Sequence, residues 1–477
     1  MSKILLINPP ISFNEQFVGG SKNVAGLLAP LGLAYIAAYL ENNCHKVRII
    51  DGMVENINVD DIAKIAKTYD MVGITSITLF DLRSRETAAA IKQTDKDVPI
   101  VLGGPHPTVV PFESLKDRSV DYVIRGEGEI TILELIDVMG GKKKPEDVLG
   151  LAFKKKGIKG NKDKIIINEN RPLIKNLDEI PMPARHLLPM KLYKYSEGRA
   201  RNKKALSMIS SRGCVHNCSF CSNNEMFRRI FRAHSPERVV EEMEVLIKKY
   251  KAKEIGFWDD NIMFIKKRVI EICNLIKERG IEIDWHAEGR VDAADFEVLK
   301  KMKESGCYLL AYGVESGSER ILKDIGKNVT KSKIRNAFAM SKKVGLMTRG
   351  YFILGFIGET LKEMNQTIEF AKELNPDIAT FAFLTPLPGT RDFTRAQKEG
   401  RFDKDYYKKR LIPEFNFLDK PIYLPTGIKE EQMINIHRKA YREFYFRPSY
   451  MVKQIKNIKS FADIKRLLNG AMAVVNA

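Results

Sequence analysis

Long apolar runs are absent from the chain. Its 477 residues include no stretch of about 18 consecutive apolar residues, the length that a membrane-spanning helix requires. The opening Met-Ser-Lys-Ile-Leu-Leu-Ile-Asn reads directly as a strand, so no cleavable leader is expected. Cysteine is also scarce, and six residues in a chain of this length do not make a disulfide framework. The chain is therefore expected to be a cytoplasmic, globular protein.

Acidic residues are in deficit. Lys and Arg number 79 against 60 Asp and Glu, which gives a net charge of +19. The lysines are scattered over helical faces such as 241–253, without the interleaved aromatic residues of a single-strand-binding surface, so no nucleic-acid partner is expected. Basic residues are densest from Arg438 to Arg466, among Tyr, Phe, Ile and Leu. This segment is either an amphipathic helical cap or a peripheral contact with a lipid or the inner face of an anionic membrane.

Three cysteines lie close together in the segment Ser-Arg-Gly-Cys-Val-His-Asn-Cys-Ser-Phe-Cys, residues 211–221. Cys214, Cys218 and Cys221 are separated by three and then two residues. Thiolates select iron–sulfur clusters or zinc, and a closed site of either kind takes four ligands. Three neighbouring thiolates therefore predict a cluster with one open metal position. The alternatives are three unrelated thiols, or a zinc site completed by a histidine such as His216 or His234.

The first 140 residues alternate short apolar, β-rich runs with segments of helical periodicity. This pattern predicts a parallel, doubly wound Rossmann-like sheet in an α/β fold, which binds ligands at the carboxyl ends of its strands. Strands are expected at Lys3–Asn8, Lys46–Asp51, Met71–Ser76, Ile100–Gly103 and Tyr122–Arg125, and helices at 32–42, 59–68, 82–94 and 131–139. The loops after the strands carry small, hydroxylated or charged residues, namely Asn8-Pro9-Pro10, Ser76, Thr78, Gly103-Gly104, His106 and Gly126-Glu127.

Residues 141–204 lose this periodicity and read as a linker with a hairpin at Leu149–Lys156 and Lys164–Asn168. From 205 to 395, repeated strand–helix units predict a partial (β/α)6 barrel of the TIM type. Its strands are expected at Leu206–Ser210, Glu254–Trp258, Asp284–Glu288, Tyr308–Gly313, Thr348–Leu354 and Ala379–Leu384. Residues 396–477 would then form a small, mostly helical C-terminal domain.

Polar residues gather after the barrel strands. Asp259 and Asp260 follow the second strand, Arg290 the third, Glu315 and Ser316 the fourth, and Gly358 lies in the loop after the fifth. Polar groups at a barrel mouth are costly unless they meet a ligand or a hydrogen-bond partner within the barrel. Aromatic residues at strand ends, Trp258, His286 and Tyr312, either line a substrate site or pack in the core.

The cysteine segment, with the aromatic Phe220 before its last cysteine, resembles the signature of the radical S-adenosylmethionine (SAM) enzymes. The resemblance implies that the three thiolates hold a [4Fe-4S] cluster whose free iron chelates SAM. A low-potential donor such as flavodoxin or ferredoxin would reduce the cluster, in an anaerobic or reducing compartment. It also implies roles at the barrel mouth: Glu315, Ser316 and Gly358 near SAM, Arg290 on the SAM carboxylate, and Asp259 and Asp260 near its amino group or cobalamin.

The N-terminal loops resemble the cobalamin-binding domain that precedes the barrel in one branch of this family. The resemblance implies a cobalamin site lined by Asn8, Pro9, Pro10, Ser76, Thr78, Gly103, Gly104, Gly126 and Glu127, with His106 near the nucleotide tail. The Asp-x-His-x-x-Gly loop with which other cobalamin enzymes ligate cobalt is absent after the first strand. No histidine is therefore expected below cobalt.

The segment Tyr441–Tyr450 resembles relatives of the anaerobic magnesium-protoporphyrin monomethyl ester cyclase. For the whole chain, the resemblance implies a class B radical SAM methyltransferase that transfers a methyl group through cobalamin to an unactivated carbon. Cyclisation, coupling or oxidation without methyl transfer is the first alternative, and a non-catalytic cobalamin or iron–sulfur sensor is the second. The substrate is expected to be a small molecule, a tetrapyrrole or a lipid.

Overall fold

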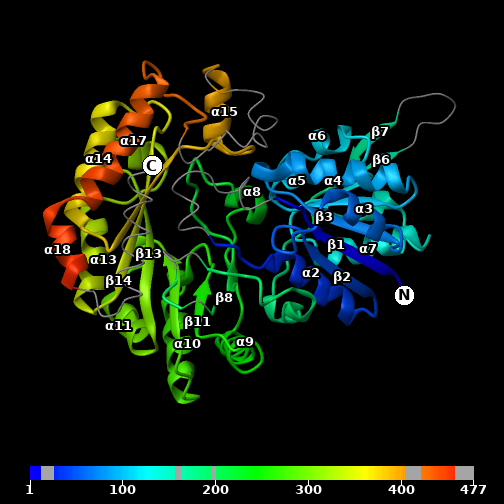
Figure 1. Ribbon diagram of the computed structural model, residues 1–477, viewed down its shortest axis with the longest axis horizontal. Coiled ribbons are helices and arrows are strands. Elements are labelled where there is room, and N and C mark those ends of the chain that lie inside the picture. Colours follow the sequence, from blue (N-terminus) through cyan, green and yellow to red (C-terminus); the bar gives the residue numbers. More distant parts are fainter. Residues whose placement is uncertain are drawn as a thin grey trace.

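Two sheets form the two lobes of the molecule (Figure 1). The structure, a computed structural model, describes residues 1–11, 26–155, 163–195, 200–202, 204–400, 402 and 420–456. Within these residues, none of the helices has both the length and the apolar character that crossing a membrane requires.

The N-terminal lobe is a seven-stranded sheet with helices on both faces. Its strands are β1 Lys3–Asn8, β2 Lys46–Asp51, β3 Met71–Thr75, β4 Ile100–Gly103, β5 Tyr122–Ile124, β6 Leu151–Lys155 and β7 Lys164–Ile167. They lie in the order β2-β1-β3-β4-β5-β6-β7, with β1 to β5 parallel and β6 and β7 antiparallel. The five predicted parallel strands are confirmed. The hairpin expected in the linker is β6 and β7, and it extends this sheet.

Alternate residues of β1 explain the two covered faces. Ile4 and Leu6 enter one core cluster, together with residues of α2 (Leu31–Asn42) and α7 (Glu129–Met139). Leu5 and Ile7 enter the opposite cluster, with residues of α3 (Val59–Ala66) and α4 (Asp81–Thr94). A strand buried on both faces needs a continuous apolar run, and this is the pattern that made the sheet predictable.

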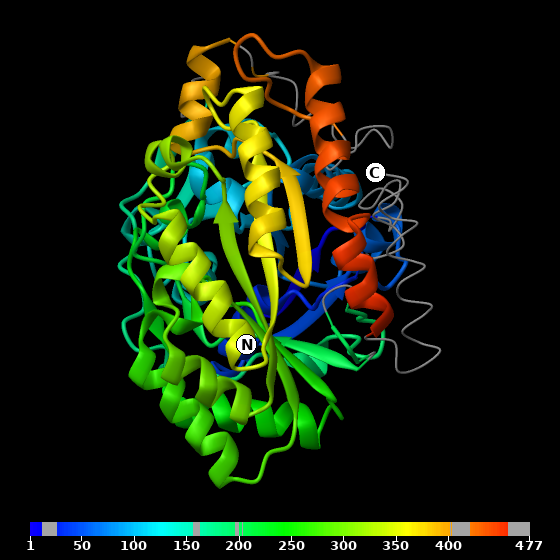
Figure 2. The ribbon, with the colours of Figure 1, turned by 90° about the vertical axis from the view of Figure 1, so that its left-hand side faces the viewer.

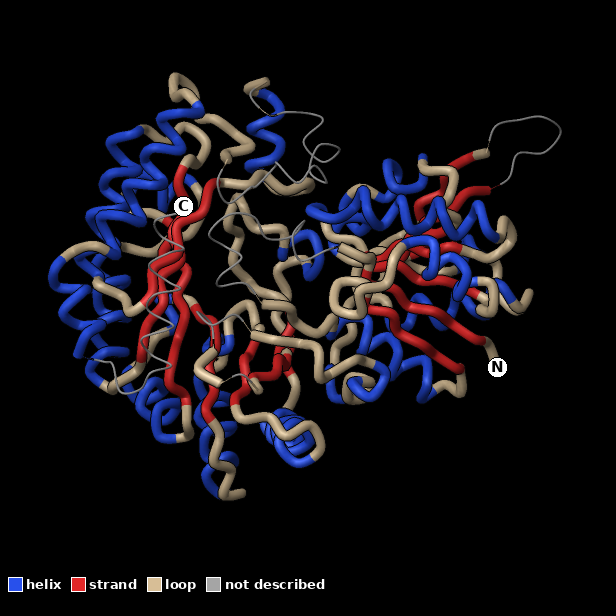
Figure 3. The backbone as a smooth tube through the Cα atoms, viewed as in Figure 1, coloured by secondary structure: helices blue, strands red, loops and turns tan. Residues whose placement is uncertain are grey.

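The second lobe is an open sheet of six parallel strands in the order β15-β14-β13-β12-β11-β8. These strands are β8 Ala205–Met208, β11 Glu254–Phe257, β12 Asp284–Gly289, β13 Cys307–Glu315, β14 Met347–Leu354 and β15 Ile378–Phe383. The covering helices are α9 Pro236–Lys248, α10 Lys266–Glu278, α11 Phe296–Glu304, α13 Lys331–Lys343 and α14 Leu361–Leu374. They surround the strands from outside (Figure 3), as the predicted partial barrel requires.

The C-terminal helices complete the barrel. α17 (Glu430–Tyr445) lies beside β15 and α14 (Figure 2), and α18 (Pro448–Lys456) follows it. Met433, Ile436, Ala440 and Phe444 of α17 belong to the same core cluster as the barrel strands. The segment expected as a separate helical domain is therefore, over its described residues, packed onto the barrel. Residues 457–477, the end of the predicted basic segment, lie outside the described residues.

Candidate active site

The three cysteines lie on a loop with a closed stem. β9 (Ser211–Arg212) and β10 (Arg232–Ala233) pair antiparallel and close the loop, and all three cysteines are free thiols. The stem is tight at Gly213, whose φ of +88° and lack of a side chain are both required: a Cβ there would lie 2.1 Å from the carbonyl oxygen of Ile230. The loop therefore begins at a position that only glycine can occupy.

Contacts of the two residues between Cys218 and Cys221 hold the loop on the barrel. The Ser219 amide donates to the carbonyl of Ile325 at 2.8 Å, and the Ser219 hydroxyl donates to Asp392 at 2.9 Å. The ring of Phe220, the aromatic residue of the motif, lies 5.7 Å from the ring of Phe356. The loop is thus fixed by α15 (Arg391–Lys398) and by the ends of the barrel strands.

Arg290 places a positive charge beside the cysteines. Its Nη1 lies 3.7 Å from the Cys218 sulfur, while its other nitrogens donate to Asp292 at 2.9 and 3.0 Å and to the carbonyl of Lys327 at 2.9 Å. The side chain is buried. A guanidinium in this position stabilises a thiolate or an anionic cluster. It is committed to Asp292 and Cys218, so the predicted ion pair with the SAM carboxylate stays a prediction.

Glu315 forms a buried ion pair that the sequence did not indicate. Lys327 Nζ lies 2.8 Å from Glu315 Oε1, and the two side chains are 5% and 9% exposed. A Cβ at Gly313 would lie 2.3 Å from that carboxylate oxygen, so the glycine makes room for the pair. Glu315 itself has a φ of +70°, a strained conformation for a residue with a side chain. Strain of this kind clusters at functional sites, which agrees with the predicted place of Glu315 in the SAM site.

Two predicted ligand-binding residues are instead occupied within the barrel. Ser316 is fully buried, and its hydroxyl lies 3.2 Å from the hydroxyl of Thr367. Asp259, 1% exposed, accepts hydrogen bonds from the Ser210 amide at 2.7 Å, the Ser210 hydroxyl at 2.6 Å and the Ser211 hydroxyl. Ser316 thus ties the end of β13 to α14, and Asp259 ties the end of β11 to the end of β8. Their predicted contacts with SAM and cobalamin stay predictions, and their side chains are held by hydrogen bonds within the barrel.

Two other predicted residues remain accessible. Asp260 accepts a hydrogen bond from the Gly213 amide at 3.1 Å, which places it at the start of the cysteine loop. Asp260 is exposed. Gly358 has a φ of +71°, and its Cβ position faces open space. Both lie where a ligand at the barrel mouth can reach them.

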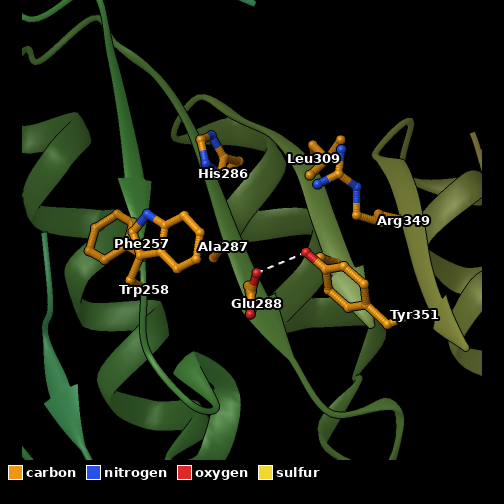
Figure 4. Close-up of a pocket in the computed structure, with 9 residues that line it drawn as sticks. Phe257, Trp258, His286, Ala287, Glu288, Leu309, Arg349 and Tyr351 are labelled. Atoms are coloured by element: carbon orange, nitrogen blue, oxygen red, sulfur yellow. Dashed lines mark hydrogen bonds between the residues drawn. The ribbon is translucent and has the colours of Figure 1, made fainter. Parts of the chain in front are cut away.

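The inner face of the barrel carries polar and aromatic side chains (Figure 4). Tyr351 donates a 2.9 Å hydrogen bond to Glu288, and His286 lies beside them with its Nδ1 3.0 Å from Glu254. The pocket is lined by Phe257, Trp258, His286, Ala287, Glu288, Leu309, Ala311, Arg349 and Tyr351. Trp258 and His286 thus line the inner face of the barrel. This is one of the two arrangements expected for aromatic residues at strand ends, the other being packing in the core. Tyr312 does not: it is buried and bonds to Ser341 of α13.

At the carboxyl edge of the N-terminal sheet, the hydroxylated residues form a network beneath the loops. Ser76 donates to Asp81 at 3.0 Å, and His106 lies 3.4 Å from Asp81 and 3.2 Å from the Thr78 hydroxyl. Burial alone would raise the pKa of the Asp81 carboxyl, but His106 and Arg85 hold it below its usual value. Ser76 is 1% exposed, and its predicted contact with cobalamin stays a prediction.

The glycines of this edge leave space for a ligand. A Cβ at Gly103 or Gly126 would have no heavy atom within 4 Å, whereas Gly104, with a φ of +103°, packs against the Ser76 carbonyl. Two open glycines at the ends of β4 and β5 fit a large ligand that approaches the backbone.

The other predicted members of the edge make internal contacts. Asn8 donates to Asp51 at 2.8 Å. Pro9 is buried, and Pro10 packs against Gly52, where a Cβ would lie 2.6 Å from it. Glu127 is paired with Arg212 and Arg232 of the cysteine-loop stem. Sequence reasoning missed the two arginine partners of Glu127 because they lie more than 80 residues away along the chain.

Comparison with known proteins identifies the family. Residues 208–371 match the model of the radical SAM superfamily, and residues 20–136 match that of the B12 binding domain. An uncharacterised methyltransferase of Pyrococcus horikoshii is 39% identical over 475 residues, which cover 99% of this chain and 98% of the relative. The chain belongs to the cobalamin-binding radical SAM family. Its cofactors are those of the family, a [4Fe-4S] cluster, SAM and cobalamin.

Further relatives of this cobalamin-dependent radical SAM enzyme have different activities. The anaerobic magnesium-protoporphyrin IX monomethyl ester cyclase of Rubrivivax gelatinosus is 28% identical, with 94% of this chain and 78% of the relative covered. The cytidylyl-2-hydroxyethylphosphonate methyltransferase of Streptomyces wedmorensis is 26% identical, with 88% and 86% covered. The predicted family and its cofactors are thereby confirmed.

Solved structures agree with the architecture. The cobalamin-dependent radical SAM enzyme OxsB superposes with a TM-score of 0.74 at 17% identity, covering all of this chain and 72% of that one. The radical SAM methyltransferase TsrM of Kitasatospora setae gives 0.71 at 15% identity, with 99% of both chains covered. At these identities the likeness shows the fold, and it confirms the predicted cobalamin-binding sheet followed by a radical SAM barrel.

Proposed function

We propose that this protein is a methyltransferase that carries a methyl group from SAM, through cobalamin, to an unactivated carbon of a small molecule. The observation that carries the proposal is the presence of two cofactor sites in one chain, the free cysteine triad at the barrel mouth and the open glycine edge of the N-terminal sheet. When bound, the cluster with SAM supplies a 5′-deoxyadenosyl radical and cobalamin supplies a transferable methyl group.

The chain's own residues would perform four tasks in this reaction. Cys214, Cys218 and Cys221 would hold the cluster, and Arg290 would balance its negative charge. The Glu315–Lys327 pair would orient SAM from the end of β13, where its buried charges keep a fixed geometry. The open backbone at Gly103 and Gly126 would seat cobalamin against the N-terminal sheet.

The inner barrel face would hold the substrate. Its lining combines the aromatic surfaces of Trp258 and Tyr351 with the hydrogen-bonding groups of Glu288 and His286 (Figure 4). Such a lining would suit a molecule with both an apolar or planar surface and polar groups. Cyclisation without methyl transfer is the second candidate, because the relative from Rubrivivax gelatinosus is a cyclase.

The products of SAM distinguish these functions. Anaerobically reconstituted protein is incubated with SAM and a low-potential reductant, and 5′-deoxyadenosine and S-adenosylhomocysteine are quantified by mass spectrometry. The proposal predicts both products, with only 5′-deoxyadenosine lost in Cys218→Ala. Deoxyadenosine alone would favour cyclisation or coupling, and the absence of both products would contradict an enzymatic role.

An acidic electron-transfer protein such as flavodoxin or ferredoxin is proposed to dock over the cysteine loop. Two exposed arginines bind carbonyls of this loop, Arg229 that of Val215 at 3.3 Å and Arg391 that of Asn217 at 2.6 Å. Lys323 is exposed in the adjacent α12 (Glu319–Asp324). Positive charge close to the cluster would steer an acidic donor to it.

Comparing electron sources tests this docking. Lys323→Glu is expected to raise the KM for reduced flavodoxin and to leave turnover with a chemical reductant unchanged. Equal KM values for flavodoxin in wild type and variant would contradict the docking surface.

A peripheral contact with an anionic membrane would depend on the basic residues near the C-terminus. Among the described basic residues of this segment, Arg447 is engaged with the barrel: it donates to the carbonyl of Lys372 at 3.1 Å and lies over the ring of Phe444. A membrane role is therefore proposed only for residues 457–477, and liposome co-sedimentation of the full chain and a truncation at 456 tests it. Equal binding by the two would reject that role.

A further inference from the structure

A cluster of four charged side chains joins the two lobes at the stem of the cysteine loop. Arg212 and Arg232 lie directly opposite each other in the β9–β10 pair. Glu127, from the loop after β5 in the N-terminal lobe, accepts hydrogen bonds from both: from Arg212 Nη1 at 2.9 Å and from Arg232 Nη1 at 2.7 and 2.9 Å. Glu129 accepts from Arg212 Nη2 at 2.7 Å. One carboxylate therefore grips both strands of the stem.

The cluster is buried and balanced in charge. The side chains of Glu127 and Glu129 are 6% and 4% exposed, and those of Arg212 and Arg232 are 11% and 8% exposed. Burial alone would raise the pKa of the Glu127 carboxyl, but the two guanidinium groups hold it below its usual value. Without Glu127, two like charges would face each other across a two-stranded ladder, which is destabilising.

Glu127 is itself fixed within the N-terminal lobe. It follows Gly126, whose φ is +77° and whose amide donates to the Thr108 hydroxyl at 3.0 Å. Its second carboxylate oxygen also accepts from the amide of Ile174 at 2.9 Å. Gly126 is one of the two open glycines of the proposed cobalamin edge. The same short loop thus borders that edge and holds the stem of the loop that bears the cysteines.

We infer that Glu127 is a positioning residue that sets the separation between the cluster and cobalamin by clamping Arg212 and Arg232. This inference rests on the proposed function, because it needs both cofactor sites to be occupied. In this role Glu127 acts through the stem of the cysteine loop, and not through the direct contact with cobalamin that the sequence predicted. Each cofactor can bind to its own site whatever the distance between the two sites. Transfer between the cofactors requires the two sites to be correctly spaced, so the clamp should affect transfer and leave binding unchanged.

Electron–electron dipolar coupling between the reduced cluster and cob(II)alamin tests the inference in the reconstituted protein, because this coupling falls steeply with distance. Glu127→Gln keeps the size of the side chain and removes its charge. We expect iron and cobalamin contents close to wild type, with a weaker and broadened coupling. Glu113→Gln, which changes an exposed glutamate paired with Lys116 in the same lobe, should leave the coupling unchanged.

The outcomes are separable. Wild-type coupling in Glu127→Gln, with or without a lower Tm, would overturn the inference and leave the proposed function standing, since the clamp would then serve stability alone. A wild-type protein that retains no cluster or no cobalamin would overturn the proposed function and the inference with it. If Glu127→Gln does not fold, Arg232→Gln carries the same test, because Glu127 keeps its bond to Arg212.

Discussion

At the scale of single residues, the loop after β14 encloses a carboxyl group. Glu359 is 2% exposed, and its Oε2 accepts from the amides of Gly355 at 2.7 Å and Phe356 at 3.0 Å. Its other oxygen has no hydrogen-bond partner among the described residues. Burial raises the pKa of Glu359 to about 8, although the two amides act in the opposite direction.

Glu359 should make stability depend on pH. Its folded pKa lies above the usual value of 4.5, so its contribution is fully present below that pH and is lost as the pH rises through about 8. Glu359→Gln keeps an acceptor for both amides and removes the charge. The Tm of the variant, measured by differential scanning fluorimetry, should fall less than that of wild type between about pH 6 and 9. Glu373→Gln, at an exposed ion pair, is the control, and equal slopes in all three proteins would contradict the prediction.

Lys327 offers a test of the SAM site. Lys327→Met would leave Glu315 buried without its counter-ion, and the loss of a hydrogen bond to a charged group costs about 1.5–3 kcal/mol. We expect SAM affinity, measured by equilibrium dialysis on the reconstituted protein, to fall about 10- to 100-fold. Lys323→Met changes an exposed lysine nearby and should bind SAM as wild type does. Unchanged affinity in Lys327→Met would remove the pair from the SAM site.

The cysteines and the open glycines were predictable from the sequence because their chemistry lies in local spacing. Lys327 was not, since its partner Glu315 lies 12 residues away with no motif between them. Ser316 and Asp259 were expected to face ligands because polar residues at strand ends are costly, yet buried hydroxyl groups satisfy both. Motif position therefore predicted which loops form the site, and only packing showed which side chains face inward.

At the scale of elements, the edge of the barrel sheet shows how α17 replaces a missing strand. The hydroxyl of Tyr441 bonds to the amide and carbonyl of Phe381, and that of Tyr445 to the amide and carbonyl of Ala379. Four residues of helix rise about 6 Å, close to the roughly 6.6 Å spanned by two residues of strand. The spacing of the tyrosines thus matches alternate residues of β15, whose edge would otherwise expose unpaired groups.

Tyr445→Phe tests this covering of the edge. The change keeps the ring and leaves the amide and carbonyl of Ala379 without their partner, at a cost of about 1–3 kcal/mol. Hydrogen exchange followed by mass spectrometry should show faster exchange in β15, while the N-terminal sheet is unaffected. Tyr39→Phe in α2 should leave β15 as in wild type, and slow exchange in Tyr445→Phe would show that the hydroxyl does not protect the strand.

The parallel strands were predictable to within about two residues. In the N-terminal sheet they are continuous apolar runs, as strands buried on both faces require, and in the barrel the regular strand–helix repeat located them. The sequence predicted that the hairpin forms, but not that it extends the N-terminal sheet beside β5. Its pairing with β5 joins Phe153 to Tyr122 and Ala152 to Val123, long-range contacts that no local pattern encodes. The role of the tyrosines of α17 was not predictable for the same reason, since their hydroxyl groups bond to a strand about 60 residues earlier in the chain.

At the scale of the whole molecule, one charged cluster joins the two lobes. In it, Glu127 and Glu129 of the N-terminal lobe pair with Arg212 and Arg232 at the stem of the cysteine loop. The family match establishes both cofactors, and we propose the glycine edge for cobalamin and the cysteine loop for the cluster. Function at this scale depends on methyl transfer between two sites in one chain.

The most direct test follows the methyl group itself. Reconstituted protein with cob(I)alamin is mixed with SAM whose methyl group carries three deuterium atoms, and the cobalamin is extracted in the dark for mass spectrometry. The account predicts trideuterated methylcobalamin in wild type and in Cys218→Ala, because this transfer does not require the cluster. Labelled methylcobalamin at the level of a protein-free control would contradict the methyltransferase assignment.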